Sequence, residues 1–268
     1  MKTLSGIQRH LRILREFLRA ALVEEMEYRS HFVSNLLATL FGAAMAVLTV
    51  QVFFYQTKSL GGWGFYEMLI LLGIFNALQG FAGMVLQPNI GRIVQHIRKG
   101  TLDFILTKPV DSQFFISFRH IAIWKLADIL TGFAIVSFGM YGAGMRVTVG
   151  SVLEFLVLML ASVVTLYSLW MGVMTLSFWF VKVENISFLF SSLFETGRYP
   201  VQVYRGWLRV LLTYVFPVAV MTTFPAASLI GKLGGAQVLV SVAIACTTFG
   251  LTRWFWKRAL RFYTSASS

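Results

Sequence analysis

Long uninterrupted apolar segments dominate this chain, and they constrain its fold more than any other feature. Several of them reach the length of about 18 residues or more that a helix needs to cross the hydrocarbon of a bilayer. Of the 268 residues, 57% are hydrophobic and only 13% are charged, whereas a soluble domain usually has about 25% charged residues. The sequence therefore predicts an all-α, polytopic integral membrane protein rather than a large soluble core.

Basic residues give the chain a net charge of +12, and they gather in four clusters, at 2–29, 92–108, 198–209 and 253–261. Basic residues near the ends of spans mark the cytoplasmic side of a membrane. The charge therefore predicts topology and contact with anionic lipids, and not nucleic-acid binding. Cys246 is the single cysteine and lies in an apolar run, which predicts neither a disulfide nor a cysteine-based metal site.

The order of apolar and polar segments predicts one transmembrane domain over residues 1–268. Residues 1–28 place leucines on one helical face and arginines largely off it, which is typical of a helix lying in the membrane interface. The same residues lack the apolar core of a secretory signal, so the first span is expected to act as an uncleaved anchor. Both termini are expected in the cytoplasm, which requires an even number of crossings. The expected spans are 31–55, 65–87 (ended by Pro88), 113–141, 151–181, 185–198 and 235–256.

Residues 182–231 allow two arrangements that keep this parity. In the first, residues 182–209 stay cytoplasmic and 210–230 cross; the arginines within 198–209 favour it by the positive-inside rule. In the second, a short fifth span at 185–198 precedes helices over 200–231 that re-enter the outer leaflet. Repeated prolines favour the second, because broken helices at membrane depth survive only where they line protein or a cavity. The charges alone favour the first.

The longest polar interruption between apolar runs is the segment 92–115, RIVQHIRKGTLDFILTKPVDSQFF. Gly100 is expected to end one helix, Thr101 to cap the next, and Asp111 to cap the third span. The residues around Leu102 are too apolar for a free loop, so residues 88–110 are expected to dock a short helix into a groove on a partner protein. The alternative is a helix that rests on the bilayer surface.

Motifs for catalysis are absent from the sequence. The glycines within 231–235 lack the spacing of a phosphate-binding loop, and neither H-E-x-x-H nor G-x-S-x-G occurs. The chain is therefore not expected to be an enzyme, and an ATP-driven transporter would need its motor in another chain. Lys125 and Asp128 lie on one helical face. They predict either a structural ion pair with a snorkelling lysine or the charge pair of a stand-alone proton- or ion-coupled carrier.

Four segments in order resemble the permease subunits of ABC exporters, of the ABC-2 type with six spans and no fused ATPase. The segments are KGTLDFILTKPV, ENISFLFSSLFETGRYPVQVYRGWLR, FPVAVMTTFPAASLIG and RFYTSAS, and the resemblance covers nearly the whole chain. It implies an N-terminal elbow helix, a coupling helix after the second span, and a short fifth span followed by re-entrant outer helices. It therefore implies the second arrangement of residues 182–231.

The resemblance also implies a function, partners and site residues. The chain would be the permease of an ATP-driven exporter in the cytoplasmic (inner) membrane, with a mostly apolar route. Two copies of a separate ATPase would hold ATP and Mg²⁺, with no cofactor in this chain, and the second permease would be identical or a paralogous sister. The expected ATPase-coupling residues are Arg92, Gln95, Arg98, Lys99, Gly100, Thr101, Leu102, Asp103, Lys108, Lys182 and Glu184. The expected outer gate consists of Tyr199, Pro200, Pro217 and Pro225.

Overall fold

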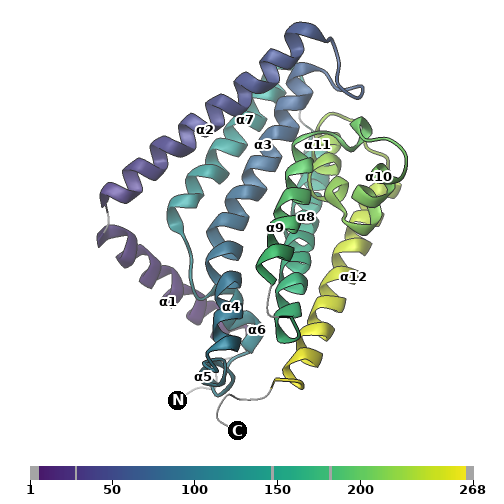
Figure 1. Cartoon of the computed structure of the whole chain (residues 1–268). Helices are drawn as coiled ribbons and strands as arrows, with labels where there is room; N and C mark the ends of the chain where they lie inside the picture. The colour runs from purple at the N-terminus through teal and green to yellow at the C-terminus, as the bar shows by residue number, and fades with distance from the viewer. Residues whose placement is uncertain (1–5, 28, 146–147, 181–182, 264–268) are drawn as a thin grey trace.

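The computed structural model describes residues 6–27, 29–145, 148–180 and 183–263. Throughout these residues the regular elements are helices, so the chain is an all-α polytopic membrane protein. Five of the described helices are long and apolar enough to cross a membrane, and a bent helix pair counts as a sixth. The beginning of α1 (Gly6–Glu27) and the end of α12 (Gly235–Leu260) lie toward the same end of the molecule (Figure 1).

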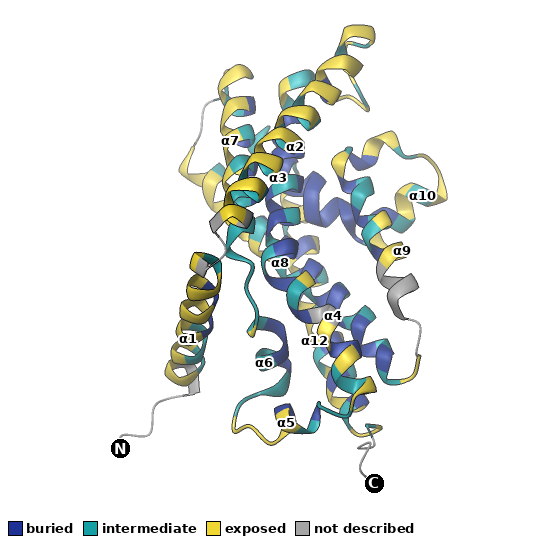
Figure 2. Cartoon of the chain, turned by 60° about the vertical axis from the view of Figure 1, so that its left-hand side comes forward, coloured by how far each residue is buried: buried dark blue, intermediate teal, exposed yellow. Residues whose placement is uncertain are grey.

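The first two helices form one edge of the molecule. In α1, Phe17 and Ala21 are the buried residues of the described part, and Phe17 packs edge-on against Phe115. The arginines of α1 stay exposed, as the sequence predicts for an interfacial helix. The next helix, α2 (Arg29–Gln56), is exposed almost throughout and buries Val50 alone among its described residues (Figure 2). This edge therefore contributes little to the core of a single copy.

Two helices meet closely through glycines and form the centre of the fold. They are α3 (Phe65–Phe81) and α7 (Leu126–Gly142). A Cβ placed on Gly132 would lie 2.6 Å from the carbonyl oxygen of Gly73, and one on Gly139 would lie 2.9 Å from that of Tyr66. Small residues allow helix backbones to approach one another in membranes, where no hydrophobic effect drives the helices together.

The helix that begins with α3 does not end at Pro88, so the predicted stop at residue 87 is wrong. It passes through a π-helical turn, η1 (Ala82–Leu86), and continues as α4 (Gln87–Arg98). Proline lacks the N–H that would bond the carbonyl four residues earlier, and here that carbonyl, of Met84, accepts a 2.9 Å hydrogen bond from the N–H of Ala122. Residues 65–98 thus form one long helical unit, called the pillar below.

The predicted third span, 113–141, is interrupted. A short helix, α6 (Ser112–Phe118), is followed by non-helical residues, by η2 (Ile123–Lys125) and only then by α7. Asn89 of the pillar holds the break open: its amide accepts from the N–H of His120 (2.8 Å) and donates to the carbonyl of His120 (2.5 Å). Asp111 accepts the N–H of Phe114 at 3.0 Å, so it caps α6 and not the span itself.

The C-terminal half is built around α8 (Val149–Thr175, continued by η3, Leu176–Phe178) and α12. These two helices pack side by side, and the hydroxyl of Thr252 donates to the carbonyl of Ser168 at 2.8 Å. Between them in sequence come first three short elements: α9 (Val183–Glu195), η4 (Thr196–Arg198) and η5 (Val201–Val203). With 13 residues, α9 is shorter than the helices that are long enough to cross a membrane.

A bent helix pair follows, and its second arm fills the middle of the fold. Its arms are α10 with η6 (Trp207–Val210, Leu211–Val215) and η7 with α11 (Ala219–Thr223, Phe224–Leu229), and they meet at a bend of 70°. Every residue from 217 to 228 is buried, and buried residues gather at the centre of Figure 2. The hydroxyl of Ser162 donates to the carbonyl of Val220 at 3.1 Å, which gives the broken helix one of the partners that a membrane interior demands.

Candidate functional site

The pillar ends in a short helical hairpin, residues 99–110, which we call the tip. Gly100 has φ +67°, a left-handed conformation that glycine tolerates. The N–H of Thr101 then donates to the carbonyl of His96 at 3.0 Å, and that of Gly100 to the carbonyl of Ile97 at 3.3 Å. These two bonds form a Schellman closure. It ends α4 and folds α5 (Asp103–Leu106) back against the pillar.

Side chains of the tip divide between the core and the surface. Leu102 is fully buried and Ile105 nearly so, whereas the ring of Phe104 between them is 72% exposed. Lys108 follows, with its ammonium 4.7 Å from the centroid of the Phe115 ring. An exposed aromatic ring on a firmly packed base is the form that binding hot spots take, and Phe104 is a residue that the sequence did not single out.

The predicted coupling residues are not equivalent. Those exposed on the pillar and tip are Arg92, Gln95, Arg98, Lys99 and Lys108, and Gly100, Thr101 and Asp103 are partly exposed. Leu102 supports the tip from inside and presents nothing to a partner. Leu102 is also the N-cap of α5, so the predicted cap at Thr101 is wrong; the Thr101 hydroxyl lies 2.8 Å from Nδ1 of His96. Glu184 lies in the first turn of α9, and Lys182 lies outside the described residues.

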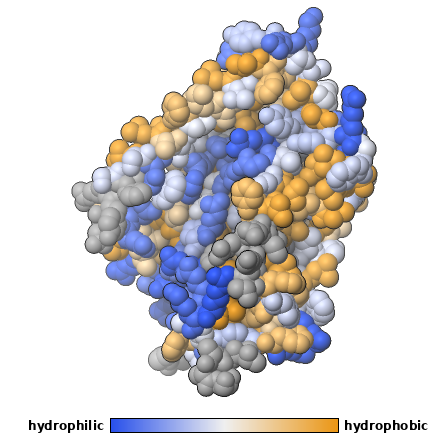
Figure 3. All heavy atoms as spheres, viewed as in Figure 1, coloured by the Kyte–Doolittle hydropathy of each residue, from blue (hydrophilic) through white to orange (hydrophobic). Residues whose placement is uncertain are grey.

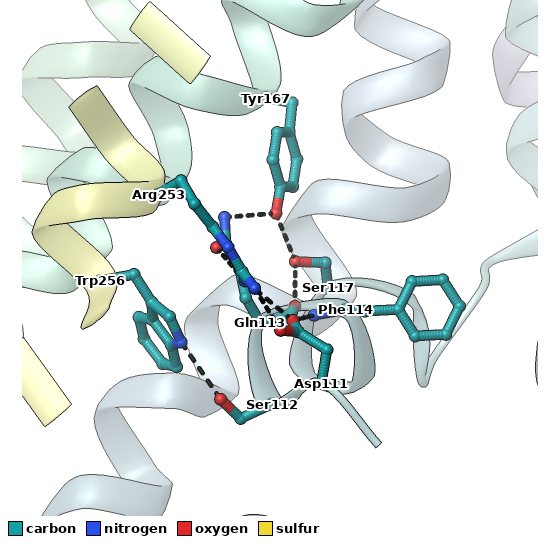
Figure 4. A network of polar contacts seen from close by, with 8 residues as sticks. All are labelled: Asp111, Ser112, Gln113, Phe114, Ser117, Tyr167, Arg253 and Trp256. Carbon is teal, nitrogen blue, oxygen red and sulfur yellow. Dashed lines mark hydrogen bonds and ion pairs between the residues drawn. The ribbon is translucent and has the colours of Figure 1, made fainter. Parts of the chain in front are cut away.

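A polar network, called the joint below, connects the tip to the C-terminal half (Figure 4). Arg253 of α12 forms a bidentate ion pair with Asp111, and its Nη1 also donates to Oε1 of Gln113 at 2.9 Å. The hydroxyl of Tyr167 on α8 accepts from the Gln113 amide (3.0 Å) and lies 2.9 Å from the hydroxyl of Ser117. Three helices, α6, α8 and α12, are therefore tied together at one place.

The joint gives Asp111 two structural roles. The hydrogen bond from Arg253 lowers the pKa of the Asp111 carboxyl from its usual value, and the N–H of Phe114 that it caps adds to the effect. Bidentate arginine–carboxylate pairs are among the stronger polar contacts in proteins and fix orientation as well as distance. Because Asp111 directly follows the tip, this pair links the end of the tip to α12. Asp111 and Arg253 are 142 residues apart in sequence, and no local pattern connects them.

A second polar region is a groove of about 520 Å³ between α2 and the pillar. Hydrophilic residues line the hollow beside α2 in Figure 3. The pillar contributes the amides of Asn76, Gln79 and Gln87, and α2 contributes a face of small and polar residues. That face consists of Asn35, Ala38, Thr39, Gly42, Ala43, Ala46 and Thr49. Apolar side chains line the groove as well, namely Met45 of α2, Leu72 and Phe75 of the pillar, and Trp124.

Two ion pairs lie in or beside the groove. Lys125 contacts Asp128 at 2.6 Å, and the other Asp128 oxygen accepts from the hydroxyl of Thr39 at 2.6 Å. Lys125 and Asp128 therefore form an ion pair, which both alternatives left open by the sequence require.

Glu195 accepts from the Gln79 amide at 2.6 Å and pairs with Arg198 at 2.6 Å. The Arg198 guanidinium also lies 5.2 Å from the centroid of the Phe75 ring, beside the middle of α3. Arg198 is therefore a residue of the groove. Amides and ion pairs are costly against lipid and mark water-filled or protein-covered surfaces.

The residues predicted as an outer gate lie in different surroundings. Pro200, Pro217 and Pro225 are buried in the core. Tyr199 borders a small cavity of about 60 Å³ together with Phe53 of α2, and the two rings meet edge-on at 6.4 Å. Of these four, Tyr199 alone borders one of the cavities described here. Within the described residues, no cluster of His, Cys, Asp or Glu is placed to hold a metal ion.

Comparison with known proteins gives one family match. A family model described as an ABC-2 family transporter protein matches residues 40–267. That range begins within α2 and includes the pillar, the tip, the joint and the groove apart from Asn35, Ala38 and Thr39. No curated protein sequence matches the chain significantly.

Proposed function

Since the chain belongs to the ABC-2 transporter family and is the permease of an ABC transporter, we propose that it forms the membrane part of an ATP-driven exporter. Permeases of this family work with an ABC ATPase. We propose two copies of a separate ATPase, which hold ATP and Mg²⁺, and a second permease that is identical to this chain or a sister of it. The chain itself then supplies the path and no catalytic group.

The tip is the observation that carries this proposal. It presents Phe104 to the outside on a base fixed by Leu102 and Ile105. The tip directly follows the pillar, which is one helical unit of 34 residues. A closing ATPase that grips Phe104 would push the pillar directly. The same push reaches α12 through the Asp111–Arg253 pair.

Charge supports a cytoplasmic position for the tip. Exposed Arg98, Lys99 and Lys108 lie there, and Lys257 and Arg258 end α12 toward the same end of the molecule (Figure 1). The opposite end carries a pair between Lys232 and Glu67 at 2.6 Å. The positive-inside rule then orients the chain in the cytoplasmic membrane with both termini inside. The exposed arginines of α1 would contact anionic lipids of the inner leaflet.

The groove is the proposed path. Its polar lining would be covered on the open side by a second permease, because α2 alone leaves it exposed. Movement of the pillar against α2 would change the width of the groove. Tyr199 and the packed residues around Pro200, Pro217 and Pro225 would close its outer end.

The experiment compares two phenylalanines of nearly equal exposure. Phe104 is 72% exposed on the tip and Phe41 is 70% exposed on α2. We expect Phe104→Ala to weaken binding of the ATPase to the permease in nanodiscs by about tenfold or more, the size of a hot-spot loss. Phe41→Ala should leave ATPase affinity unchanged. Unchanged affinity in Phe104→Ala, with the protein monodisperse and folded, would contradict the proposal.

A further inference from the structure

A third cavity, of about 610 Å³, lies between α1, α6, α8 and α12. Its walls are apolar and largely aromatic, with Phe81, Phe118, Val163, Val164 and Phe249 along them. The ring of Phe118 stacks on that of Tyr167 at 6.5 Å, and Phe249 lies 6.3 Å from Tyr167 on the other side. The cavity therefore offers flat apolar surfaces to whatever fills it.

The surroundings of the cavity belong to the lipid-facing surface. Phe249 is 45% exposed, and its neighbour Leu251 on α12 is exposed as well. On α8, Leu156 and Leu160 are also exposed. In a membrane these side chains touch acyl chains, so hydrocarbon and not water is the medium beside the cavity. Apolar cavities of this kind stay dry and take up apolar ligands.

One end of the cavity is polar. Arg253, Asp111 and Gln113 of the joint line it, together with His10 of α1. Arginine has five N–H donors, and contacts to Asp111 and Gln113 use three of those of Arg253. The remaining donors suit phosphate oxygens. Arg9 and Arg12, on either side of His10 in the sequence of α1, are exposed and positively charged.

We propose that this cavity binds an anionic phospholipid from the leaflet in which α1 lies. One acyl chain occupies the space between Phe118, Val164 and Phe249, and the phosphate lies beside Arg253. The apolar wall and the polar end match the two halves of such a molecule. The lipid fills the gap between the α1–α6 side and the α8–α12 side, next to the Asp111–Arg253 pair, and so stabilises the joint.

The test uses phosphatidylglycerol with a photoactivatable diazirine near the end of one acyl chain. The full chain is reconstituted with this probe, irradiated and mapped by mass spectrometry. We expect cross-links to concentrate on peptides with Phe118, Val164 and Phe249, well above those on exposed α2. Val164→Trp, which fills the cavity, should lower these cross-links at least about fivefold. Val157→Trp, at a 44% exposed residue about two turns away on the same helix, should leave them unchanged.

Competition by unlabelled lipids distinguishes the contribution of the phosphate headgroup from that of the acyl chains. Unlabelled phosphatidylglycerol should reduce the cross-links at lower concentration than diacylglycerol with the same acyl chains, which lacks the phosphate. Equal competition by the two would overturn the placement of the phosphate beside Arg253. Cross-links spread evenly over the lipid-facing surface of the wild-type protein, or unaltered in folded Val164→Trp, would overturn the site itself. If that variant does not fold, the wild-type map and Val164→Phe decide the question.

Discussion

The helix α2 and the pillar, which begins with α3, are almost equally apolar, yet they occupy opposite environments. In an apolar 18-residue window of each, 78% of the pillar residues are buried but only 6% of those of α2. The glycines differ in the same way: a Cβ on Gly73 of α3 would lie 2.5 Å from the carbonyl oxygen of Gly132, whereas one on Gly42 of α2 meets nothing within 4 Å. Hydropathy therefore indicates that a helix enters the membrane, and close contacts of small residues decide where it packs.

The exposed helix α2 has two faces of different character. Thr39, Gly42, Ala46 and Thr49 recur at spacings of three or four and line the groove, while large apolar side chains such as Phe41 face away from the core. A helix with one polar stripe is stable in a membrane when that stripe faces water or protein. This is the physical reason for placing a second permease across the groove.

The largest effect we expect comes from exchanging these glycines for leucine. Gly132→Leu would force the backbones of α3 and α7 apart, because neither can yield by rotating a side chain. A loss of about 3 kcal/mol or more in the free energy of unfolding is expected. Gly42→Leu on α2 should keep the thermal midpoint of the purified protein within a few degrees of wild type. Similar midpoints for the two variants would contradict the contrast between α2 and α3.

A smaller effect is expected from polar side chains of the pillar and of α2. Asn89→Ala leaves the N–H and the carbonyl of His120 without their partners, and each unsatisfied buried group costs about 1–3 kcal/mol. Thr49→Ala on α2 removes only a bond to its own helix, to the carbonyl of Met45 at 2.8 Å, and should change stability by less than about 0.5 kcal/mol. Denaturant titration in mixed micelles measures both, and a Thr49 variant as unstable as the Asn89 variant would refute this ranking.

The smallest effect concerns pH at the base of the pillar. Burial, followed by the charge of Arg92, lowers the pKa of His120 from 6.5 to about 4. Between these values the unfolded chain binds more protons, so the folded state loses stability as the pH falls from 6.5 toward 4. Because the ring is partly solvated, we expect the folded state to lose about 1 kcal/mol of stability at pH 5. His120→Gln should remove that part of the pH dependence of the thermal midpoint, and an unchanged slope would show that the ring does not titrate in this range.

The sequence predicted those functional residues that a short stretch of neighbouring residues marks. The polar segment after the second apolar run marked the tip, and Gly100 marked its turn. Phe104 and Leu102 are both apolar and lie two residues apart. Only the packing of the tip shows that Phe104 is exposed to a partner and that Leu102 is buried. The gate prolines were predicted because prolines interrupt helices. A proline that bends a helix need not line a transport path, and Pro217 and Pro225 are buried in the core.

The break in the third span and the continuity of the second have one cause, and it is not local. Pro88 frees the carbonyl of Met84, and Ala122 supplies the missing donor from a segment that the sequence places inside a helix. Asn89 then binds both backbone groups of His120. A proline judged by itself predicts a helix end, whereas a proline whose freed carbonyl has a partner from another segment is compatible with a helix that continues.

The sequence by itself determined that the chain crosses a membrane, which segments are apolar enough to do so, and which polar stretch is available to a partner. These properties follow from composition and spacing over twenty or thirty residues. The tertiary structure decided which span is the buried pillar and which is the exposed wall of the groove. It also placed Arg198 beside Phe75 and joined Asp111 to Arg253. Such contacts depend on backbone approach and on hydrogen-bond partners more than a hundred residues away, which local periodicity does not encode.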